Sequence, residues 1–186
     1  MLSPNPQGDY PRIDKSVYID SAARIIGKVS IGRNVFVGPG AVIRADEPGS
    51  LIAISNNCNV QDRVIIHALK DSSVLIKEST SLSHGCIIHG PCEIDRNCFI
   101  GFGSVIFKSK IGEGTFIKHL AVIERADVLP GRVVESGQVV VSQDDVNELR
   151  CTNERDKTFM EEIVKVNQNL TTGYKHGQEN SVRNNY

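Results

Sequence analysis

The sequence is poor in several residue types that usually build hydrophobic cores. It has no tryptophan, two methionines, six phenylalanines and four tyrosines among 186 residues, and nine leucines against twenty isoleucines and twenty valines. Side chains branched at Cβ are stiff at the first torsion angle and pack well on a pleated surface, so this bias counts against a bundle of helices. The length suits one domain, or one domain with an appendage, and the composition predicts mostly strands.

An excess of charge of either sign is also absent, because 21 Lys and Arg residues accompany 22 Asp and Glu residues, for a net charge of -1. No global positive field attracts nucleic acid or anionic lipid, so we expect neither as a partner. The first residues lack a basic start and an apolar run, and no later segment approaches a membrane span. Together with five cysteines in no paired spacing, these absences favour the cytoplasm.

An aliphatic residue recurs every six positions along most of the chain. A period of six fits neither a helix nor a hairpin, but it is typical of a parallel β-helix in which three hexapeptides form one coil. We expect about six coils, with inward side chains at Ile13, Ile19, Ile25, Ile31, Val37, Ile43, Ile54, Val60, Ile66, Ile76, Leu82, Ile88, Ile94, Ile100, Ile106, Ile111, Ile117, Ile123 and Leu129.

A small residue lies four positions after most of these aliphatics and relieves the crowded inner corner. This position explains four of the five cysteines, which we interpret as corner residues rather than as ligands or disulfides: Cys58, Cys86, Cys92 and Cys98. Their spacing places successive members on different faces, too far apart to bridge. Cys151 has no evident role. His119 and His176 have no other potential metal ligands stacked with them, so we expect neither to bind a metal.

Beyond Leu129 the repeat fades, and apolar residues then fall at helical spacing. Asn153 or Thr152 can cap a helix there, Gly173 can end it, and its apolar stripe consists of Phe159, Ile163, Val166 and Leu170. The stripe is too narrow for a stable isolated helix, so we expect the helix to lie along the prism.

The chain therefore divides into three segments by pattern. We expect an all-β domain over residues 1–142, built as a parallel β-helix, and a C-terminal helical segment over residues 143–175. The polar residues 176–186 are expected to form a flexible tail.

The repeat also predicts which polar residues meet. Arg44, His67 and His89 each directly follow an inward aliphatic of one face at successive coils, so they form one outward column. Two His side chains about 4.8 Å apart can converge on one ion with bonds of about 2.0–2.1 Å. His84 belongs to the adjoining face and would complete the set only from a neighbouring copy, as when three prisms meet around a threefold axis.

Further polar residues gather near these histidines. Gln61, with Asn59 just before it, lies on the face of His84 one coil below, whereas Asp46 and Glu47 lie one coil below His67. A single His on such a surface is usually a solvated or hydrogen-bonded side chain. Three of them with this stacking favour a metal site with an open position for water.

Several stretches carry a resemblance to a known family. They are RADE at 44–47, NVQD at 59–62 followed by His67, SHGCIIHGP from Ser83, CFIGFGSVIFKSKIG at 98–112, SGQVVVSQ at 136–143 and VNQNLTTGYK at 166–175. With these motifs the chain resembles the γ-class carbonic anhydrases over nearly its whole length. Within that class it resembles the archaeal zinc or iron enzymes and the N-terminal domain of the carboxysomal scaffold.

The resemblance implies a left-handed β-helix assembled as a homotrimer with one metal at each interface. His67 and His89 of one subunit and His84 of the next would bind Zn²⁺, and three imidazoles also accept Fe²⁺ or Co²⁺. The reaction implied is the reversible hydration of carbon dioxide to bicarbonate and a proton, by water whose pKa zinc lowers to near 7.

The resemblance also implies roles for the other residues. Arg44 and Asp46 match an intersubunit ion pair, Gln61 and Asn59 hydrogen-bonding residues near the bound water, Glu47 a proton-transfer carboxylate and Asn167 a residue that orients carbon dioxide. One departure is Lys70, which occupies the place of a second shuttle Glu in the archaeal enzymes, so we expect dependence on external buffer. Two alternatives remain: a structural or scaffolding trimer with little activity, and a hexapeptide acyltransferase.

Overall fold

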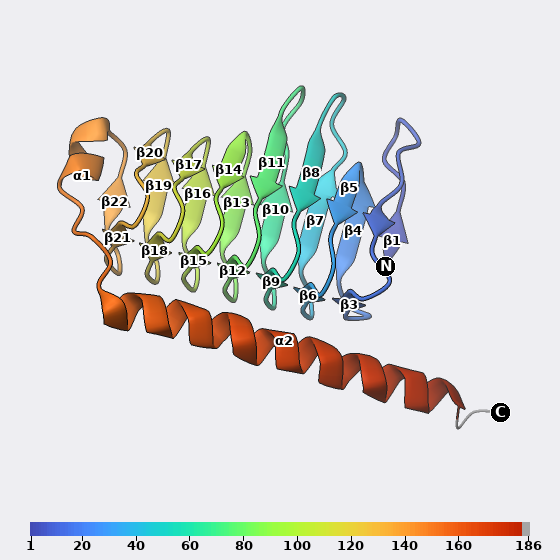
Figure 1. Ribbon diagram of the computed structural model, residues 1–186. Helices are drawn as coiled ribbons and strands as arrows, with labels where there is room; N and C mark the ends of the chain where they lie inside the picture. Colours follow the sequence, from blue (N-terminus) through green and yellow to red (C-terminus); the bar gives the residue numbers. More distant parts are fainter. Residues whose placement is uncertain (184–186) are drawn as a thin grey trace.

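Short parallel strands form three sheets along one prism (Figure 1). The computed structural model describes residues 1–183, with side chains described for residues 1–177. The first sheet consists of β1 (Leu2–Ser3), β4 (Arg24–Gly27), β7 (Val42–Ala45), β10 (Ile65–His67), β13 (Ile87–His89), β16 (Val105–Phe107), β19 (Val122–Glu124) and β22 (Val139–Val140). The second consists of β2 (Arg12–Ile13), β5 (Val29–Ile31), β8 (Leu51–Ile54), β11 (Ser73–Ile76), β14 (Cys92–Ile94), β17 (Lys110–Ile111) and β20 (Asp127–Val128). The third consists of β3 (Tyr18–Ile19), β6 (Phe36–Val37), β9 (Asn59–Val60), β12 (Ser81–Leu82), β15 (Phe99–Ile100), β18 (Phe116–Ile117) and β21 (Val133–Val134).

Each coil contributes one strand to each sheet before the chain rises to the next coil. The result is a left-handed parallel β-helix of hexapeptide repeats with about seven turns and a C-terminal helix, which confirms the predicted fold class. The interruptions after Ile43 and Ile66 extend from the prism without disturbing the register, because Ile66 pairs with both Ile43 and Ile88.

The last part of the repeat differs from the prediction. Val128 pairs with Ile111 and is 3% exposed, whereas Leu129, predicted as an inward position, is 42% exposed. The segment from Ile123 to Val128 is one residue shorter than a hexapeptide, as is the segment from Ile106 to Ile111, so a strict step of six misses the inward residue. The coil continues beyond this point through β21 and β22, which adds to the expected six turns.

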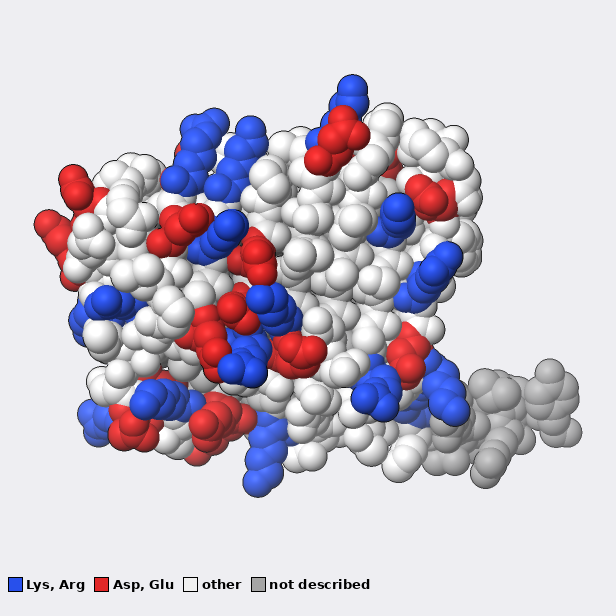
Figure 2. Space-filling view, turned by 45° about the horizontal axis from the view of Figure 1, so that its top comes forward, with Lys and Arg blue, Asp and Glu red and all other residues white. Residues whose placement is uncertain are grey.

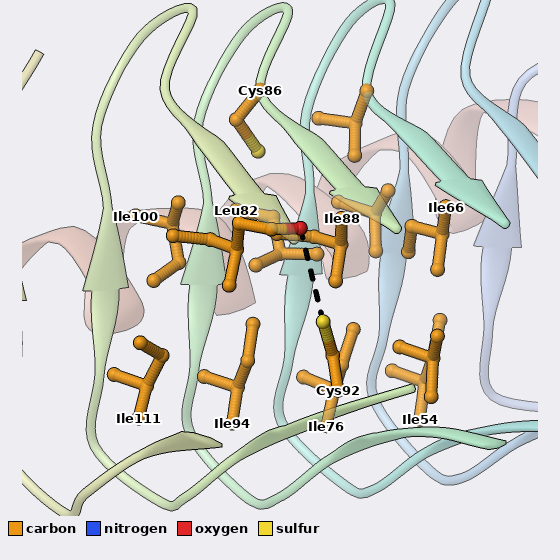
Figure 3. Packing of buried hydrophobic residues seen from close by; sticks show 14 of the residues in the cluster. Ile54, Ile66, Ile76, Leu82, Cys86, Ile88, Cys92, Ile94, Ile100 and Ile111 are labelled. Carbon is orange, nitrogen blue, oxygen red and sulfur yellow. Dashed lines mark hydrogen bonds between the residues drawn. The ribbon is translucent and has the colours of Figure 1, made fainter. Parts of the chain in front are cut away.

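The interior of the prism is a column of aliphatic side chains stacked coil upon coil (Figure 3). Ile66, Ile88, Ile94 and Ile100 are fully buried. The four predicted corner cysteines are buried and free, and burial raises the pKa of the Cys58 thiol to about 12. Such thiols act as small apolar residues with a weak S–H donor, consistent with a corner role.

Two helices follow the last strand. α1 (Gln143–Asn147) follows a capping box formed by Ser142 and Asp145, and α2 (Glu154–Arg183) begins directly after Asn153. Asn153 Oδ1 accepts from the Asp156 N–H at 3.0 Å, and Asp156 Oδ2 accepts from the Asn153 N–H at 2.9 Å. Asn153 is thus one of the two caps that the sequence predicted.

α2 lies along the third sheet and is longer than expected (Figure 1). It continues through Gly173, where the sequence predicted its end, and through residues 176–183, which were expected to be a flexible tail. A glycine inside a helix costs only about 1 kcal/mol. Stacking of Tyr174 on Tyr18, with ring centroids 4.8 Å apart, can offset that cost. The remaining tail residues, 184–186, lie outside the described part of the chain.

The predicted apolar stripe of α2 does not form the main contact with the prism. Val166 is 54% exposed and Leu170 is 42% exposed, whereas Met160, Asn167 and Thr171 are buried. The helix is rotated toward a more polar face because the middle of the third sheet presents polar side chains outward. The helix thus lies along the prism as expected, but Val166 and Leu170 of the stripe do not face it.

The face of the molecule shown in Figure 2 carries no broad field of one sign. Lys and Arg residues are interleaved with Asp and Glu residues on the face shown in Figure 2, in keeping with the net charge of -1. Within residues 1–183, neither helix combines the length and the apolar character needed to cross a membrane.

Candidate metal centre

Two histidines lie on adjacent rungs of the first sheet. His67 on β10 pairs in parallel register with Arg44 on β7 and with His89 on β13, so the predicted outward column is present. His67 Nδ1 lies 3.1 Å from His89 Nε2, and the ring centroids are 4.9 Å apart. The spacing follows from the strand separation of the sheet, because each ring leaves the backbone at the same position of its coil.

The facing nitrogens of this column fit a shared metal ion. They are His67 Nδ1 and His89 Nε2, and their 3.1 Å separation is close to the roughly 3.3 Å between two nitrogens bound to one tetrahedral ion by bonds of about 2.0–2.1 Å. The other nitrogen of each ring, His67 Nε2 and His89 Nδ1, is buried without a hydrogen-bond partner, as is Asp46 Oδ1. Buried polar groups normally find partners, so a cation that takes up imidazole lone pairs suits this site.

The protonation state of His89 also suits metal binding. Burial, followed by the neighbouring His67, lowers the pKa of His89 below its ordinary value, and Glu47 opposes this shift only in part. The neutral imidazole is the form that offers a lone pair to a metal.

Two carboxylates approach the same column from the first interruption. His67 Nε2 lies 3.3 Å from Asp46 Oδ1 and 3.6 Å from Glu47 Oε1. Arg44 contacts Asp46 at 3.2 Å within the same chain, and the Lys70 N–H donates to Glu47 Oε2 at 2.6 Å. Carboxylates beside a ligating His orient its ring and raise its basicity.

A second group of predicted residues meets on the third sheet and α2. Gln61 Nε2 donates to Asn59 Oδ1 and to Asn167 Oδ1, each at 2.7 Å. Asn167 Nδ2 in turn donates to the carbonyl of Ile163 at 2.8 Å. Asn167 is 106 residues from Gln61 in sequence, so the position of α2 along the prism brings this network together.

His84 belongs to neither network. Its side chain is 52% exposed, and its Nδ1 lies 3.5 Å from Asp62 Oδ2. No group of three His, Cys, Asp or Glu residues with metal-binding geometry occurs in the described part of the single chain. The structure thus places His67 and His89 together, and Gln61, Asn59 and Asn167 together, with His84 apart.

Sequence reasoning missed the aromatic side chains next to the histidines. Phe107 is the register partner of His89, with ring centroids 5.4 Å apart, and Phe102 lies 5.5 Å from His84. His119, for which the sequence suggested no partner residues, stacks on Phe102. The sequence contained a signal for these contacts, because Phe102 lies one coil after His84 and Phe107 lies one coil after His89.

Fold and site together define a hexapeptide-repeat β-helix protein with paired histidines on adjacent rungs. Residues 10–45 match the family model described as bacterial transferase hexapeptide (six repeats). A carbonic anhydrase of Methanosarcina thermophila is 35% identical over 192 aligned residues, which cover 92% of this chain and 77% of that protein. The chain belongs to the γ-class carbonic anhydrase family.

Two further similarities extend the comparison. The carboxysome assembly protein CcmM of a Nostoc species is 38% identical over 173 residues, which cover 88% of this chain. This chain spans 31% of the length of that relative. A solved structure from Bacillus cereus, assigned provisionally to the acetyltransferases, superposes with a TM-score of 0.85 at 25% identity, over 95% of this chain and 97% of that one.

Proposed function

We propose that this protein is a metal-dependent carbonic anhydrase that interconverts carbon dioxide and bicarbonate as a homotrimer. The observation that carries the proposal is the approach of His67 Nδ1 to within 3.1 Å of His89 Nε2 on adjacent rungs. The relative named carbonic anhydrase supports the same reaction, because the alignment with this chain covers 77% of its length.

The metal would be held by His67 and His89 of one copy and His84 of the next. His84 is exposed on the corner that follows the third sheet, away from the other two, so a second copy is needed to complete the set. The three imidazoles suit Zn²⁺, and Fe²⁺ or Co²⁺ fit the same donors.

The first sheet offers a surface for such a contact. Its outward column beside the histidines is aliphatic for six consecutive rungs, namely Val42, Ile65, Ile87, Val105, Val122 and Val139. Ile65 is 42% exposed and Val139 is 55% exposed. A continuous apolar strip of this kind suits burial between copies.

The remaining residues would position substrate and move the proton. The metal supplies a Lewis acid that makes water nucleophilic near neutral pH. Gln61, held by Asn59 and Asn167, would orient the attacking oxygen, and Asn167 would orient carbon dioxide. Glu47 is 3.6 Å from His67 and partly exposed, so its carboxylate can pass a proton from the site to solvent or buffer.

Metal analysis coupled to stopped-flow hydration of carbon dioxide tests this function. Protein purified with and without oxygen should contain about one divalent metal per chain and hydrate carbon dioxide in at least one state. His84→Ala should lose both metal and activity. A metal-replete trimer with no hydration in either state would instead support the scaffolding function suggested by similarity to CcmM.

One observation favours the acyltransferase alternative, namely the similarity to a solved structure assigned provisionally to the acetyltransferases. Saturable binding of acetyl-coenzyme A, measured by calorimetry, would favour that activity and contradict the proposal. We expect no binding at millimolar ligand.

A further inference from the structure

Three rings stack at the corner that follows the third sheet. His84, Phe102 and His119 occupy equivalent places on successive coils, because the Gly103 N–H donates to the His84 carbonyl and the Leu120 N–H to the Phe102 carbonyl. The His84 and Phe102 centroids are 5.5 Å apart, and those of Phe102 and His119 are 4.3 Å apart with planes inclined by only 9°. The backbone ladder thus fixes the separation of the rings.

The upper pair of the stack is held by a polar contact as well. The Phe102 N–H donates to His119 Nδ1 at 3.1 Å, which fixes the rotation of the His119 imidazole over the Phe102 ring. Phe102 is 46% exposed, an unusual position for a phenylalanine outside a contact surface. His119 covers one face of this ring, and His84 approaches the other.

The opposite side of His84 faces a carboxylate. Asp62 Oδ2 lies 3.5 Å from His84 Nδ1. A carboxylate on that side favours the tautomer with the proton on Nδ1, which leaves the lone pair on Nε2. The His84 ring therefore has Asp62 on one side and Phe102 on the other.

The other two histidines have different support. His67 is 8% exposed and contacts His89 and Asp46 directly, so contacts on the outer face of the first sheet restrict both rings. His84 has half of its side chain exposed and lacks such packing. A ligand that must reach a neighbouring copy gains most from orientation before assembly.

We propose that Phe102 and His119 are positioning residues for His84. The stacked pair, with Asp62 on the opposite side, holds the His84 imidazole in one orientation and one tautomer before the neighbouring copy arrives. This inference rests on the proposed metal site, and it assigns a role to His119, which does not contact the metal ligands directly.

Metal affinity of the trimer tests the proposal. Phe102→Leu keeps an apolar side chain but removes the flat ring, and it should weaken Zn²⁺ binding by about 10–100-fold in competition with a chromophoric chelator. His119→Ala should weaken it in the same direction. Phe102→Tyr keeps both the stack and the hydrogen bond to His119, and it should retain affinity within about threefold.

Leu120→Ala is the matched control, because Leu120 is 69% exposed on the same corner but lies outside the ring stack. Its Zn²⁺ affinity should equal that of the wild type, with the trimer verified by mass in each case. Equal losses in Phe102→Leu and Leu120→Ala would overturn the proposal, since they would indicate a general contribution of apolar contact. Unchanged affinity in Phe102→Leu would overturn it too.

A second measurement does not need the assembled site. Ring ¹⁵N chemical shifts of His84 in metal-free protein, assigned with His84→Ala, should show one protonated and one unprotonated nitrogen. In Phe102→Leu and Asp62→Ala the two shifts should move toward an averaged value. Unchanged shifts in Phe102→Leu would contradict the proposal even if that variant failed to assemble.

These readouts separate this inference from the proposed activity. Wild-type protein that binds Zn²⁺ with the expected losses in the variants, but does not hydrate carbon dioxide, would contradict the activity and leave the positioning role in place. If His84→Ala bound Zn²⁺ as tightly as the wild type, the positioning role would fail together with the proposed ligand set.

Discussion

At the scale of single residues, Lys70 has the clearest consequence for rate. Its backbone N–H donates to Glu47 Oε2 at 2.6 Å, and it is a lysine at the place where the resemblance to the archaeal enzymes led us to expect a second shuttle carboxylate. A proton leaving the site would therefore have Glu47 and external buffer as acceptors.

We expect hydration of carbon dioxide to depend strongly on buffer concentration. Lys70→Glu should raise the turnover at low buffer by about tenfold, because it adds a proton acceptor, while Lys70→Gln should have a much smaller effect. Stopped-flow rates across a buffer series provide the measurement. A wild-type rate that is equally fast at low and high buffer would refute this expectation.

Asn167 has a structural role beside the site role proposed for it. It is 7% exposed, accepts from Gln61 and donates to the Ile163 carbonyl. Asn167→Ala should lower the free energy of unfolding by about 1–2 kcal/mol, since it leaves buried polar groups unpaired, and should also lower turnover. Urea unfolding and hydration assays check the two effects. Gln168→Ala, the adjacent position on α2, should change neither.

At the scale of elements, the prism was largely predictable and the helix only in part. The six-residue period identifies the inward residues because a parallel β-helix repeats the same environment on every coil, and the column of Arg44, His67 and His89 follows from it. Single-residue shortenings such as the one before Val128 break a fixed step, since the sequence does not show which corner loses the residue.

The orientation of α2 could not be predicted from its own apolar pattern. The outward column of the third sheet is aromatic at Tyr18 and Phe36, polar at Asn59 and Ser81, and aromatic again at Phe99. The helix must match this mixed column, so its buried face includes Asn167 and Thr171. The contact between Asn167 and Gln61 depends on that rotation, which was outside the reach of sequence periodicity.

The ion pair at the start of α2 should make the free energy of unfolding depend on pH. The Arg150 guanidinium contacts Asp156 at 2.6 Å, and hydrogen bonding from Arg150 holds the pKa of Asp156 below its ordinary value. A carboxyl group with a lowered folded-state pKa stabilises the fold above its unfolded pKa of about 3.9, and that contribution is lost as the pH falls through the folded value.

Asp156→Asn should therefore lower the free energy of unfolding at pH 7 by about 2 kcal/mol and reduce its loss between pH 5 and pH 2. Urea titrations at several pH values measure both quantities. Glu154→Gln is a suitable control, because Glu154 makes only an exposed contact with Lys157. The same pH dependence in Asp156→Asn and wild type would exclude this ion pair as the source.

At the scale of the whole molecule, the proposed metal site would be divided between two copies. His67→Ala and His84→Ala should each be inactive alone, because each disrupts every site of its own trimer. When the two variants are unfolded and refolded together, sites that join His67 of one copy to His84 of the other should be restored.

Random assembly of equal amounts predicts about one quarter of the wild-type activity, since one junction in four has the productive order. Metal content should recover by the same fraction. A mixture of His67→Ala with His89→Ala is the control, because both variants damage the same half of the site and no junction is repaired. Absence of recovery in the first mixture would exclude ligands shared between copies.

The pairing of β10 with β13 has a last consequence. His67 and His89 are register partners on adjacent strands. Their spacing is therefore set by the distance between hydrogen-bonded strands and not by side-chain packing. Substitutions inside the prism can soften or unfold it, but they cannot spread this pair gradually while the ladder stays intact. The spacing of these two histidines should therefore persist unchanged up to the temperature at which the coil itself opens.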